Sequence, residues 1–292
     1  MSSRLHQIAV VNEEIAERGS YRADGTGAVV EIGGLLAAAR AGTVSYAPED
    51  AVGGMAVGMA GGAAGAADAG ALRGSFGGTL EVTAEGSMQA ARRLVEARGE
   101  HVGVLNFASA RNPGGGYLRG ARAQEEDLCR NALLYHCLLA APDYYEAHRA
   151  SSDLRYSHRV IFSPRVPVIR DEHGALLAQP YPVSFLTSPA PNAGQLARRS
   201  GGTPVDVAGV LAERAERVLA VAAHHGVREL VLGAWGCGVF RNDPAEVAAA
   251  FEHALGAYGA AFTRVVFAVW DRSPVSVNRA AFEARFGASS SR

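Results

Sequence analysis

The chain has 292 residues, of which 48% are hydrophobic, so it suits one large domain or one domain with an extension. Its formal net charge of −1, with histidine neutral, excludes a global field that would attract a polyanion such as nucleic acid. Three cysteines, Cys129, Cys137 and Cys237, are odd in number, and two share one predicted helix, so we expect a reducing, cytoplasmic compartment. The N-terminal stretch 1–19 is acidic where a signal peptide is apolar, and residues 51–67 are too weakly hydrophobic to span a membrane.

The N-terminal quarter of the chain is irregular. Residues 4–18 have helical spacing that ends at Arg18-Gly19, and residues 29–32 and 43–46 are short candidate strands. Residues 51–78 are rich in glycine and alanine, which favours a loop that is either a plain connector or an insertion. We therefore assign residues 1–77 to an N-terminal extension packed on the main domain, and residues 78–292 to that domain.

Strands and helices alternate in the remainder of the chain. This order indicates right-handed crossovers and a mainly parallel sheet covered on both faces, with ligands outside the carboxyl ends of the strands. Proline interrupts two of the strands, which predicts sheet edges or hairpins there. The predicted strands are 79–83, 102–107, 159–168, 182–187, 229–232 and 264–270, and the predicted helices are 87–98, 125–139, 207–224, 244–255 and 275–285.

A glycine-rich loop followed by two acids is the most informative segment. After the strand 102–107 come Asn112-Pro113, the glycines Gly114, Gly115 and Gly116, and then Gln124-Glu125-Glu126 at the start of a helix. Three glycines let backbone N–H groups approach an anion closely, whereas two carboxylates repel one. The combination therefore indicates a sugar-phosphate ligand whose sugar end meets the acids.

A second glycine-rich loop, 233–243, also follows an apolar strand. Gly233, Gly236 and Gly238 allow the backbone to wrap a phosphate pair, and Phe240 offers an aromatic face to a ribose or base. Asp243-Pro244 then begins a helix. The spacing GxxGxG differs from the GxGxxG fingerprint of dinucleotide-binding oxidoreductases. The alternative is a tight turn that needs glycine only to fit helix against strand.

The GGG and QEE motifs at this spacing resemble the signature of poly(ADP-ribose) glycohydrolases of the bacterial type, a branch of the macrodomain superfamily. The resemblance covers residues 78–285 and implies a three-layer α/β/α macrodomain-like fold with a mixed, mainly parallel sheet. It implies that Glu126 protonates the leaving oxygen, that Glu125 binds ribose, and that Gln124 fixes the pair. Asn112 is implied to be a ribose partner. The run Gly236, Cys237, Gly238, Val239 and Phe240 resembles the macrodomain diphosphate-binding loop.

The resemblance also implies the reaction and the partners. The expected activity is hydrolysis of ribose–ribose O-glycosidic bonds in poly(ADP-ribose), with release of ADP-ribose, by a monomer that needs no cofactor. The expected partners are poly(ADP-ribose), ADP-ribose and poly(ADP-ribosyl)ated proteins, without membrane or direct nucleic-acid binding. The alternatives are a non-catalytic ADP-ribose reader, which has no use for QEE, and a hydrolase of mono-ADP-ribose on proteins, which the fold alone allows.

Several residues keep two interpretations at this stage. Paired glutamates at a helix start are also favoured by the helix dipole, by about 0.3–1 kcal/mol each, although they follow GGG here. Asn112 is either a turn residue or a ribose partner, and Arg119 and Arg122 are either phosphate partners or solvated loop residues. At the last strand, Trp270 or Phe267 is a candidate to stack on adenine and Asp271 to read its amino group, with core packing as the alternative.

Two other kinds of chemistry are disfavoured by the sequence. Cys237 as a nucleophile would need a histidine base, but His224 and His225 precede a strand and so lie at its opposite end. The nine histidines show no HxH, HExxH or CxxC spacing, so no metal is predicted.

Overall fold

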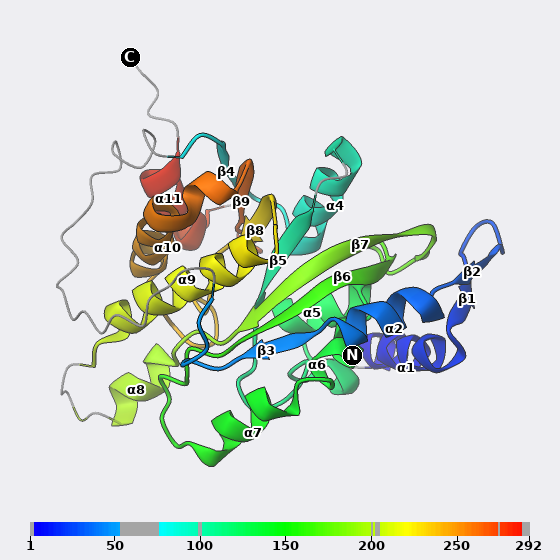
Figure 1. Ribbon diagram of the computed structural model, residues 1–292, viewed down its shortest axis with the longest axis horizontal. Helices are drawn as coiled ribbons and strands as arrows, with labels where there is room; N and C mark the ends of the chain where they lie inside the picture. Colours follow the sequence, from blue (N-terminus) through cyan, green and yellow to red (C-terminus); the bar gives the residue numbers. More distant parts are fainter. Residues whose placement is uncertain are drawn as a thin grey trace.

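The computed structural model describes residues 3–52, 76–98, 101–199, 201, 205–273 and 275–287. A seven-stranded sheet with the order β3-β6-β7-β5-β8-β9-β4 runs through the molecule, and helices lie on both of its faces (Figure 1). The strands are β1 (Ser20–Arg22), β2 (Val29–Glu31), β3 (Val44–Tyr46), β4 (Thr79–Thr83), β5 (Val102–Phe107), β6 (Val160–Arg170), β7 (Leu176–Ser188), β8 (Glu229–Leu232) and β9 (Arg264–Ala268). The helices are α1 (Ser3–Arg18), α2 (Gly33–Ala41), α4 (Ser87–Arg98), α5 (Gln124–Asn131), α6 (Leu134–Leu138), α7 (Pro142–Ala150), α8 (Ala193–Arg199), α9 (Val207–His224), α10 (Pro244–Tyr258) and α11 (Val277–Phe286), with short 3-10 helices η1 (Tyr117–Arg119) and η2 (Gly259–Ala261).

The sheet is mixed and mainly parallel, as predicted. Strands β7, β5, β8, β9 and β4 pair in parallel, whereas β6 pairs antiparallel with both β3 and β7. Parallel neighbours end at the same edge, so the chain leaves β7, β5, β8 and β9 side by side. Both glycine-rich loops therefore begin at this edge, on the adjacent strands β5 and β8.

The two faces of the sheet belong to two cores. Side chains alternate along each strand, so Val104 packs with α1, α2, α4, α5 and α6, while Leu105 packs with α9, α10 and α11. The same alternation separates Val266 from Phe267 on β9. This pattern of near-continuous apolar strands is typical of a sheet buried on both faces, and it confirms the predicted three-layer architecture.

The predicted helix 125–139 is divided into two. Ala132 has an extended backbone (φ −119°, ψ 158°) and forms a β-bridge with Val168. The N–H of Leu133 donates to the carbonyl of Pro167 at 3.1 Å. The chain thus exchanges helical hydrogen bonds for contacts with β6, and α6 begins only at Leu134. Helical periodicity continues through the break, so the sequence did not reveal it.

The proline-containing segments form a long antiparallel hairpin in the interior of the sheet. Pro167 on β6 lies opposite Pro182 on β7, so two residues without N–H groups face each other. The pairing shifts register between Ser163 and Val166, next to Pro164. The predicted hairpin is therefore right, and the predicted edge position is wrong, because β6 lies between β3 and β7 and β7 lies between β6 and β5.

The N-terminal segment contributes to the main sheet. Helix α1 forms as expected, and β3 pairs with β6 as an edge strand. A division at residue 77, which stays a prediction, therefore assigns one strand of the main sheet to the N-terminal extension. Of the predicted loop 51–78, residues 53–75 lie outside the described residues. Strand β9 ends at Ala268 and α11 begins at Val277, each two residues away from the predicted limit, and α7 had no counterpart among the predicted elements.

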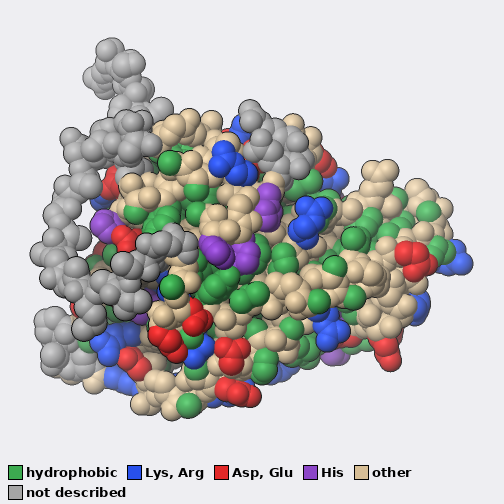
Figure 2. Space-filling model, viewed as in Figure 1, with side chains coloured by type: hydrophobic (Ala, Val, Ile, Leu, Met, Phe, Trp, Pro, Cys, Tyr) green, Lys and Arg blue, Asp and Glu red, His purple; other side chains and the backbone are tan. Residues whose placement is uncertain are grey.

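Basic and acidic side chains are interspersed over the face of the molecule shown in Figure 2, in keeping with a net charge of −1. Among the described residues, no helix is both long enough and apolar enough to cross a membrane.

Candidate active site

Gln124 attaches the start of α5 to the end of β5. Its Oε1 accepts a hydrogen bond from the N–H of Phe107 at 2.9 Å, and its Nε2 donates to the carbonyl of Leu105 at 2.8 Å. The same amide donates to Ser87 Oγ on α4 at 3.1 Å. The side chain of Gln124 thus binds two backbone groups of β5, as a neighbouring strand would. It thereby fixes the start of α5 and the positions of Glu125 and Glu126. These contacts are compatible with the role that the resemblance implied for Gln124, and that role stays a prediction.

Glu125 is buried beneath the first loop. Its Oε1 accepts from Asn106 Nδ2 at 3.2 Å, and its Oε2 accepts from the N–H of Ser109 at 2.7 Å. Burial, reinforced by the neighbouring charge of Glu126, raises the pKa of Glu125 from 4.5 to about 8, against the lowering effect of these hydrogen bonds. Burial therefore favours the protonated form of this carboxyl group.

Glu126 is also buried, with 8% of its surface exposed, but it is less constrained. Its Oε1 accepts from the N–H of Gly116 at 2.8 Å. Its Oε2 has no hydrogen-bond partner among the described residues. A buried polar oxygen without a partner costs stability, so its persistence at a loop edge indicates a ligand group that completes it.

The three glycines hold the carboxylates and leave none of their N–H groups free for an anion. Gly114 donates to Glu125, Gly115 to the carbonyl of Asn112, and Gly116 to Glu126. Gly114 and Gly115 have φ of +62° and +59°, and a Cβ on Gly115 would lie 2.5 Å from Glu126 Oε1. Two of these N–H groups thus bind the acids of the same motif and the third binds the carbonyl of Asn112, and contact of this loop with substrate stays a prediction.

The remaining polar residues of the first loop face solvent. Asn112 is exposed, and its backbone N–H donates to Ser109 Oγ at 3.2 Å, so it forms part of the turn that precedes the glycines. Arg119 and Arg122 are exposed as well. The turn interpretation of Asn112 is thus realised in the structure, and its side chain is accessible to a ligand.

The second loop presents free backbone donors at the adjacent strand. Among the described residues, none accepts a hydrogen bond from the N–H groups of Gly238, Val239 or Phe240. Gly236 has φ +72°, and a Cβ there would lie 2.3 Å from Asn242 Nδ2, so this position requires glycine. Asp243 caps α10 by accepting from the N–H of Ala245 at 2.8 Å, as predicted. Consecutive free N–H groups beside a helix start are typical of anion sites.

An aromatic pair lies at the end of this loop. Phe240 is half-buried, packs partly against the second core, and has its ring 6.1 Å from that of Tyr156. Tyr156 has φ +60°, a strained conformation for a residue with a side chain. Val239 is 86% exposed, so the loop tip is free to meet a ligand.

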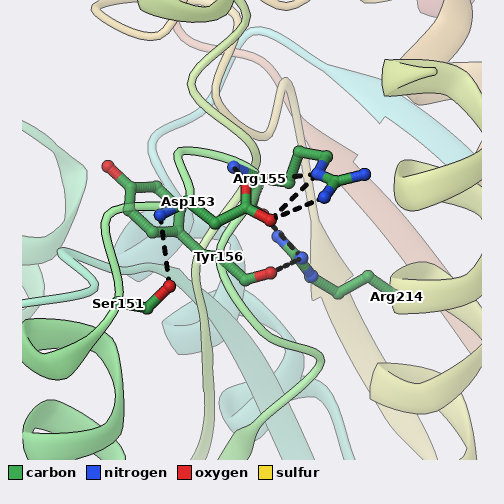
Figure 3. Close-up of polar contacts among 5 residues, drawn as sticks. All are labelled: Ser151, Asp153, Arg155, Tyr156 and Arg214. Carbon is green, nitrogen blue, oxygen red and sulfur yellow. Dashed lines mark hydrogen bonds and ion pairs between the residues drawn. The ribbon is translucent and has the colours of Figure 1, made fainter. Parts of the chain in front are cut away.

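A fully buried arginine holds Tyr156 in place (Figure 3). Arg214 on α9 donates to the carbonyls of Arg155 at 2.7 Å and Tyr156 at 3.2 Å, and to Pro189 at 2.7 Å. In the same loop, Asp153 accepts from both the backbone and the guanidinium of Arg155. Arg214 therefore joins the loop after α7 to the segment that follows β7. The loop after α7 carries Tyr156, the neighbour of Phe240.

The aromatic residues after β9 differ in burial. Phe267 is fully buried between Phe251 and Phe286 and belongs to the core, which excludes it as an adenine partner. Trp270 is 60% exposed and remains available. Asp271 uses both oxygens locally, accepting from the N–H of Ser273 and from Ser276 Oγ, and these bonds lower its pKa.

The environments of the cysteine and histidine residues do not suit nucleophilic catalysis or metal binding. Burial raises the pKa of the Cys237 thiol to about 12, which is unsuited to a nucleophile. His225 stacks on Phe162 at 3.7 Å and bonds Tyr46. Within the part of the chain that the structure describes, no three or more His, Cys, Asp or Glu side chains gather as a metal ion would require.

Four residues of the site escaped the sequence analysis: Asn106, Ser109, Tyr156 and Arg214. Asn106 sits in an apolar strand, where an inward polar residue is a signal that could have been read. Ser109 contributes a backbone N–H, which carries no sequence signal. Arg214 is one of several charged residues of a long helix, and its burial depends on tertiary packing.

The chain matches the family described as microbial-type PARG, catalytic domain, over residues 9–171. A structure of poly(ADP-ribose) glycohydrolase from Thermomonospora curvata is 44% identical, covers 97% of this chain and 100% of its own, and has a TM-score of 0.83. The same enzyme bound to the inhibitor ADP-HPD is 46% identical over the same shares, with a TM-score of 0.82. The Deinococcus radiodurans enzyme in complex with ADP-ribose is 44% identical, covers 86% of this chain and 96% of its own, and has a TM-score of 0.71. Among curated proteins no match is found.

Proposed function

Because the chain belongs to the microbial-type PARG family, we propose that it hydrolyses the ribose–ribose O-glycosidic bonds of poly(ADP-ribose) and releases ADP-ribose. One observation carries this proposal. Of the four carboxyl oxygens of Glu125 and Glu126, three accept hydrogen bonds from the protein, whereas the buried Oε2 of Glu126 has no partner among the described residues. A general acid needs an oxygen that is not already committed to a protein partner, and Glu126 Oε2 is the one of these four that meets this condition.

In the proposed reaction Glu126 acts as the general acid. It gives its proton to the leaving ribose oxygen as the glycosidic bond breaks, which leaves an oxocarbenium-like ribose. A water molecule then adds to the anomeric carbon of this ribose and gives a proton to Glu126, which restores the protonated acid. Carboxylates at adjacent helix positions diverge by about 100° and cannot flank one bond as glycosidase pairs commonly do. One acid and one supporting carboxyl group are therefore the arrangement that this spacing allows.

Burial opposes the effect of the helix N-terminus at Glu125. The sequence posed a difficulty, because a helix N-terminus favours ionised carboxylates. At Glu125 burial is the larger effect, and it raises the pKa of this carboxyl group to about 8. We assign to Glu125 a supporting role beside the acid, with contact to a ribose hydroxyl through its remaining lone pairs.

The remaining parts of ADP-ribose have matching surfaces at the same sheet edge. The free N–H groups of Gly238, Val239 and Phe240 suit the diphosphate, and the Phe240 ring suits the distal ribose. Trp270, exposed after β9, suits adenine, with Asp271 beside it, and the exposed Asn112 suits ribose. Gly236 and Cys237 shape the loop that carries these donors.

The substitution Glu126→Gln tests the function. It retains shape and donors but removes the titratable proton, so we expect polymer hydrolysis to fall by about 10²-fold or more, with ADP-ribose affinity largely retained. The measurement is ADP-ribose release from purified polymer, with Glu14→Gln on the exposed side of α1 as the matched control. Turnover by Glu126→Gln close to that of the control would remove Glu126 from catalysis. No release by the unmodified chain would favour a non-catalytic ADP-ribose reader.

We further propose that the chain acts as a monomer, without a cofactor, on polymer attached to proteins in a reducing cytoplasm. Support for the compartment comes from Cys129, Cys137 and Cys237, which are all unpaired. Gel filtration with light scattering checks the monomer.

A further inference from the structure

A cavity of about 410 Å³ lies between α1, α5 and the turn that joins β6 to β7. Arg130, Asn131 and Arg170 are its buried lining residues, with 7%, 7% and 6% of their surfaces exposed, and they form what we call its floor. Arg4, Arg122 and Asp127 are exposed residues at its rim. Its size suits a small polar ligand, and its lining contains four arginines against three acids, Asp127, Asp171 and Glu172.

The floor carries positive charge that the protein neutralises only in part. Arg170 donates through Nε to Asn12 Oδ1 at 2.8 Å and through Nη1 to the carbonyl of Gly174 at 2.7 Å, and both acceptors are neutral. The carboxylates of Asp24 and Asp171 act on its guanidinium from a distance, and burial nevertheless lowers its pKa. Arg130 donates to the carbonyl of Ala121 and forms an ion pair with Asp127 at 3.7 Å. A buried cation with incomplete counter-charge is costly, and an anion in the cavity would offset that cost.

The carboxylates around the cavity are engaged elsewhere. Asp171 accepts from the N–H groups of His173 and Ala175, both at 2.9 Å, and thereby closes the β6–β7 turn. Glu172 faces Arg92 on α4 at 3.5 Å. Asp127 is at the rim, with 58% of its side chain exposed. These acids therefore offset the charge of the two floor arginines only in part, and donors of both guanidinium groups that the hydrogen bonds above do not use could bind a ligand.

Residues that line the cavity are neighbours in sequence of the catalytic pair, Glu125 and Glu126. Asp127 directly follows Glu126 on α5, and Arg122 lies in the spacer that ends at Gln124. The carbonyl that Arg130 binds belongs to Ala121, whose Cβ is 2.6 Å from the Cβ position of Gly116. Gly116 in turn donates to Glu126. The rim of the cavity is thus formed by residues that adjoin those holding Glu126.

We propose that this cavity is a second anion site, which binds a diphosphate group of poly(ADP-ribose) outside the unit being released. Arginine suits such a group because its planar fork of donors matches phosphate oxygens. The assignment to the polymer rests on the proposed function. The anion site itself rests on the buried guanidinium groups alone.

Direct binding tests the site. Calorimetric titration with inorganic pyrophosphate is carried out with ADP-ribose at saturation, so that the second loop is occupied. We expect one saturable site, weakened at least tenfold in the double variant Arg4→Glu/Arg122→Glu. The control Arg18→Glu/Arg40→Glu changes net charge equally at exposed arginines outside the cavity, and we expect it to bind as the unmodified chain does. Absence of a saturable site, or equal weakening in both double variants, would overturn the proposal.

Kinetics test the assignment to the polymer. We expect the cavity variant to raise KM for poly(ADP-ribose) about tenfold at low salt with kcat unchanged, relative to the control variant. An aryl glycoside of ADP-ribose, whose leaving group carries no phosphate, should be hydrolysed equally by both. Weakened pyrophosphate binding with an unchanged polymer KM would overturn the assignment to the polymer. If the unmodified chain cleaves neither substrate, the proposed function fails, whereas the pyrophosphate titration still decides whether the anion site exists.

Discussion

Glu125 and Glu126 are neighbours in sequence, but the structure gives them different environments. Glu125 has both oxygens bound by Asn106 and the Ser109 turn, and Glu126 has one bound by Gly116. The difference comes from the loop 108–116, which folds back over the helix start. An acid and a supporting carboxyl group are thus distinguished by their hydrogen bonds, and the adjacent helix positions make this possible.

The raised pKa of Glu125 predicts a pH-dependent stability. Between about pH 4.5 and 8 the unfolded chain has lost this proton while the folded protein keeps it, so the folded state binds more protons and stability falls as pH rises. In Glu125→Gln this contribution is absent. We expect Tm of the unmodified chain to decrease from pH 5 to 8 relative to Glu125→Gln. Parallel Tm curves for the two proteins over this range would contradict the raised pKa.

Phe240 has two interpretations, contact with the ribose of the ligand or packing in the core. Its half-buried position between the loop and Tyr156 is compatible with both. If it packs on ribose, Phe240→Ala weakens ADP-ribose binding by roughly 1–3 kcal/mol, the range for loss of an aromatic stacking partner. Phe267→Leu, in the core, is the control and should lower Tm without changing affinity. A binding isotherm and a thermal melt on each variant decide it, and a Tm shift with intact affinity in Phe240→Ala would place Phe240 in the core.

At the residue scale, the sequence predicted what local pattern can encode. The positions of Gln124, Glu125 and Glu126 at a helix start followed from motif and spacing. The partners of Glu125 did not, because Asn106 reads as part of an apolar strand and Ser109 acts through its backbone. The partners of the glycine N–H groups did not follow from the sequence either, because nothing in GGG tells whether these groups face a ligand or the acids that follow.

At the element scale, the two glycine-rich loops differ in what their backbone N–H groups bind. The first folds onto α5 and holds the acids, whereas the second leaves consecutive N–H groups free beside α10. Alternation and periodicity predicted the strands that deliver both loops. They failed at Ala132, where pairing with Val168 breaks the helix, because that contact depends on the long β6–β7 hairpin.

Two glycine substitutions separate ligand contact from folding in the second loop. A Cβ on Gly238 would meet nothing within 4 Å, so Gly238→Val should fold normally while its side chain blocks the approach of a diphosphate. We expect ADP-ribose affinity to fall at least tenfold with little change in Tm. Gly236→Ala should instead lower Tm, because φ is +72° and Asn242 fills the space. Unchanged affinity in Gly238→Val, measured by calorimetry, would make this loop a structural turn.

At the scale of the whole molecule, the N-terminal segment is continuous with the site. Asn12 on α1 donates to the carbonyl of Arg130 at 2.9 Å, and Tyr117 after the glycines donates to the carbonyl of Ala9. Sequence composition suggested an extension, because the Gly/Ala-rich stretch after residue 50 resembles a linker. Composition cannot show that β3 pairs with β6 across more than a hundred residues.

Removal of residues 1–77 tests this integration. The segment buries Ile15, Tyr21, Ile32 and Leu36 in the core that also holds α5, and each is worth about 1.5–3 kcal/mol. Their loss, on the order of 10 kcal/mol, equals the whole stability of a typical domain of about 5–15 kcal/mol. We therefore expect a chain of residues 78–292 to lack cooperative thermal unfolding and ADP-ribose binding. Cooperative unfolding of the 78–292 chain, with ADP-ribose bound, would instead support a domain that begins at residue 78.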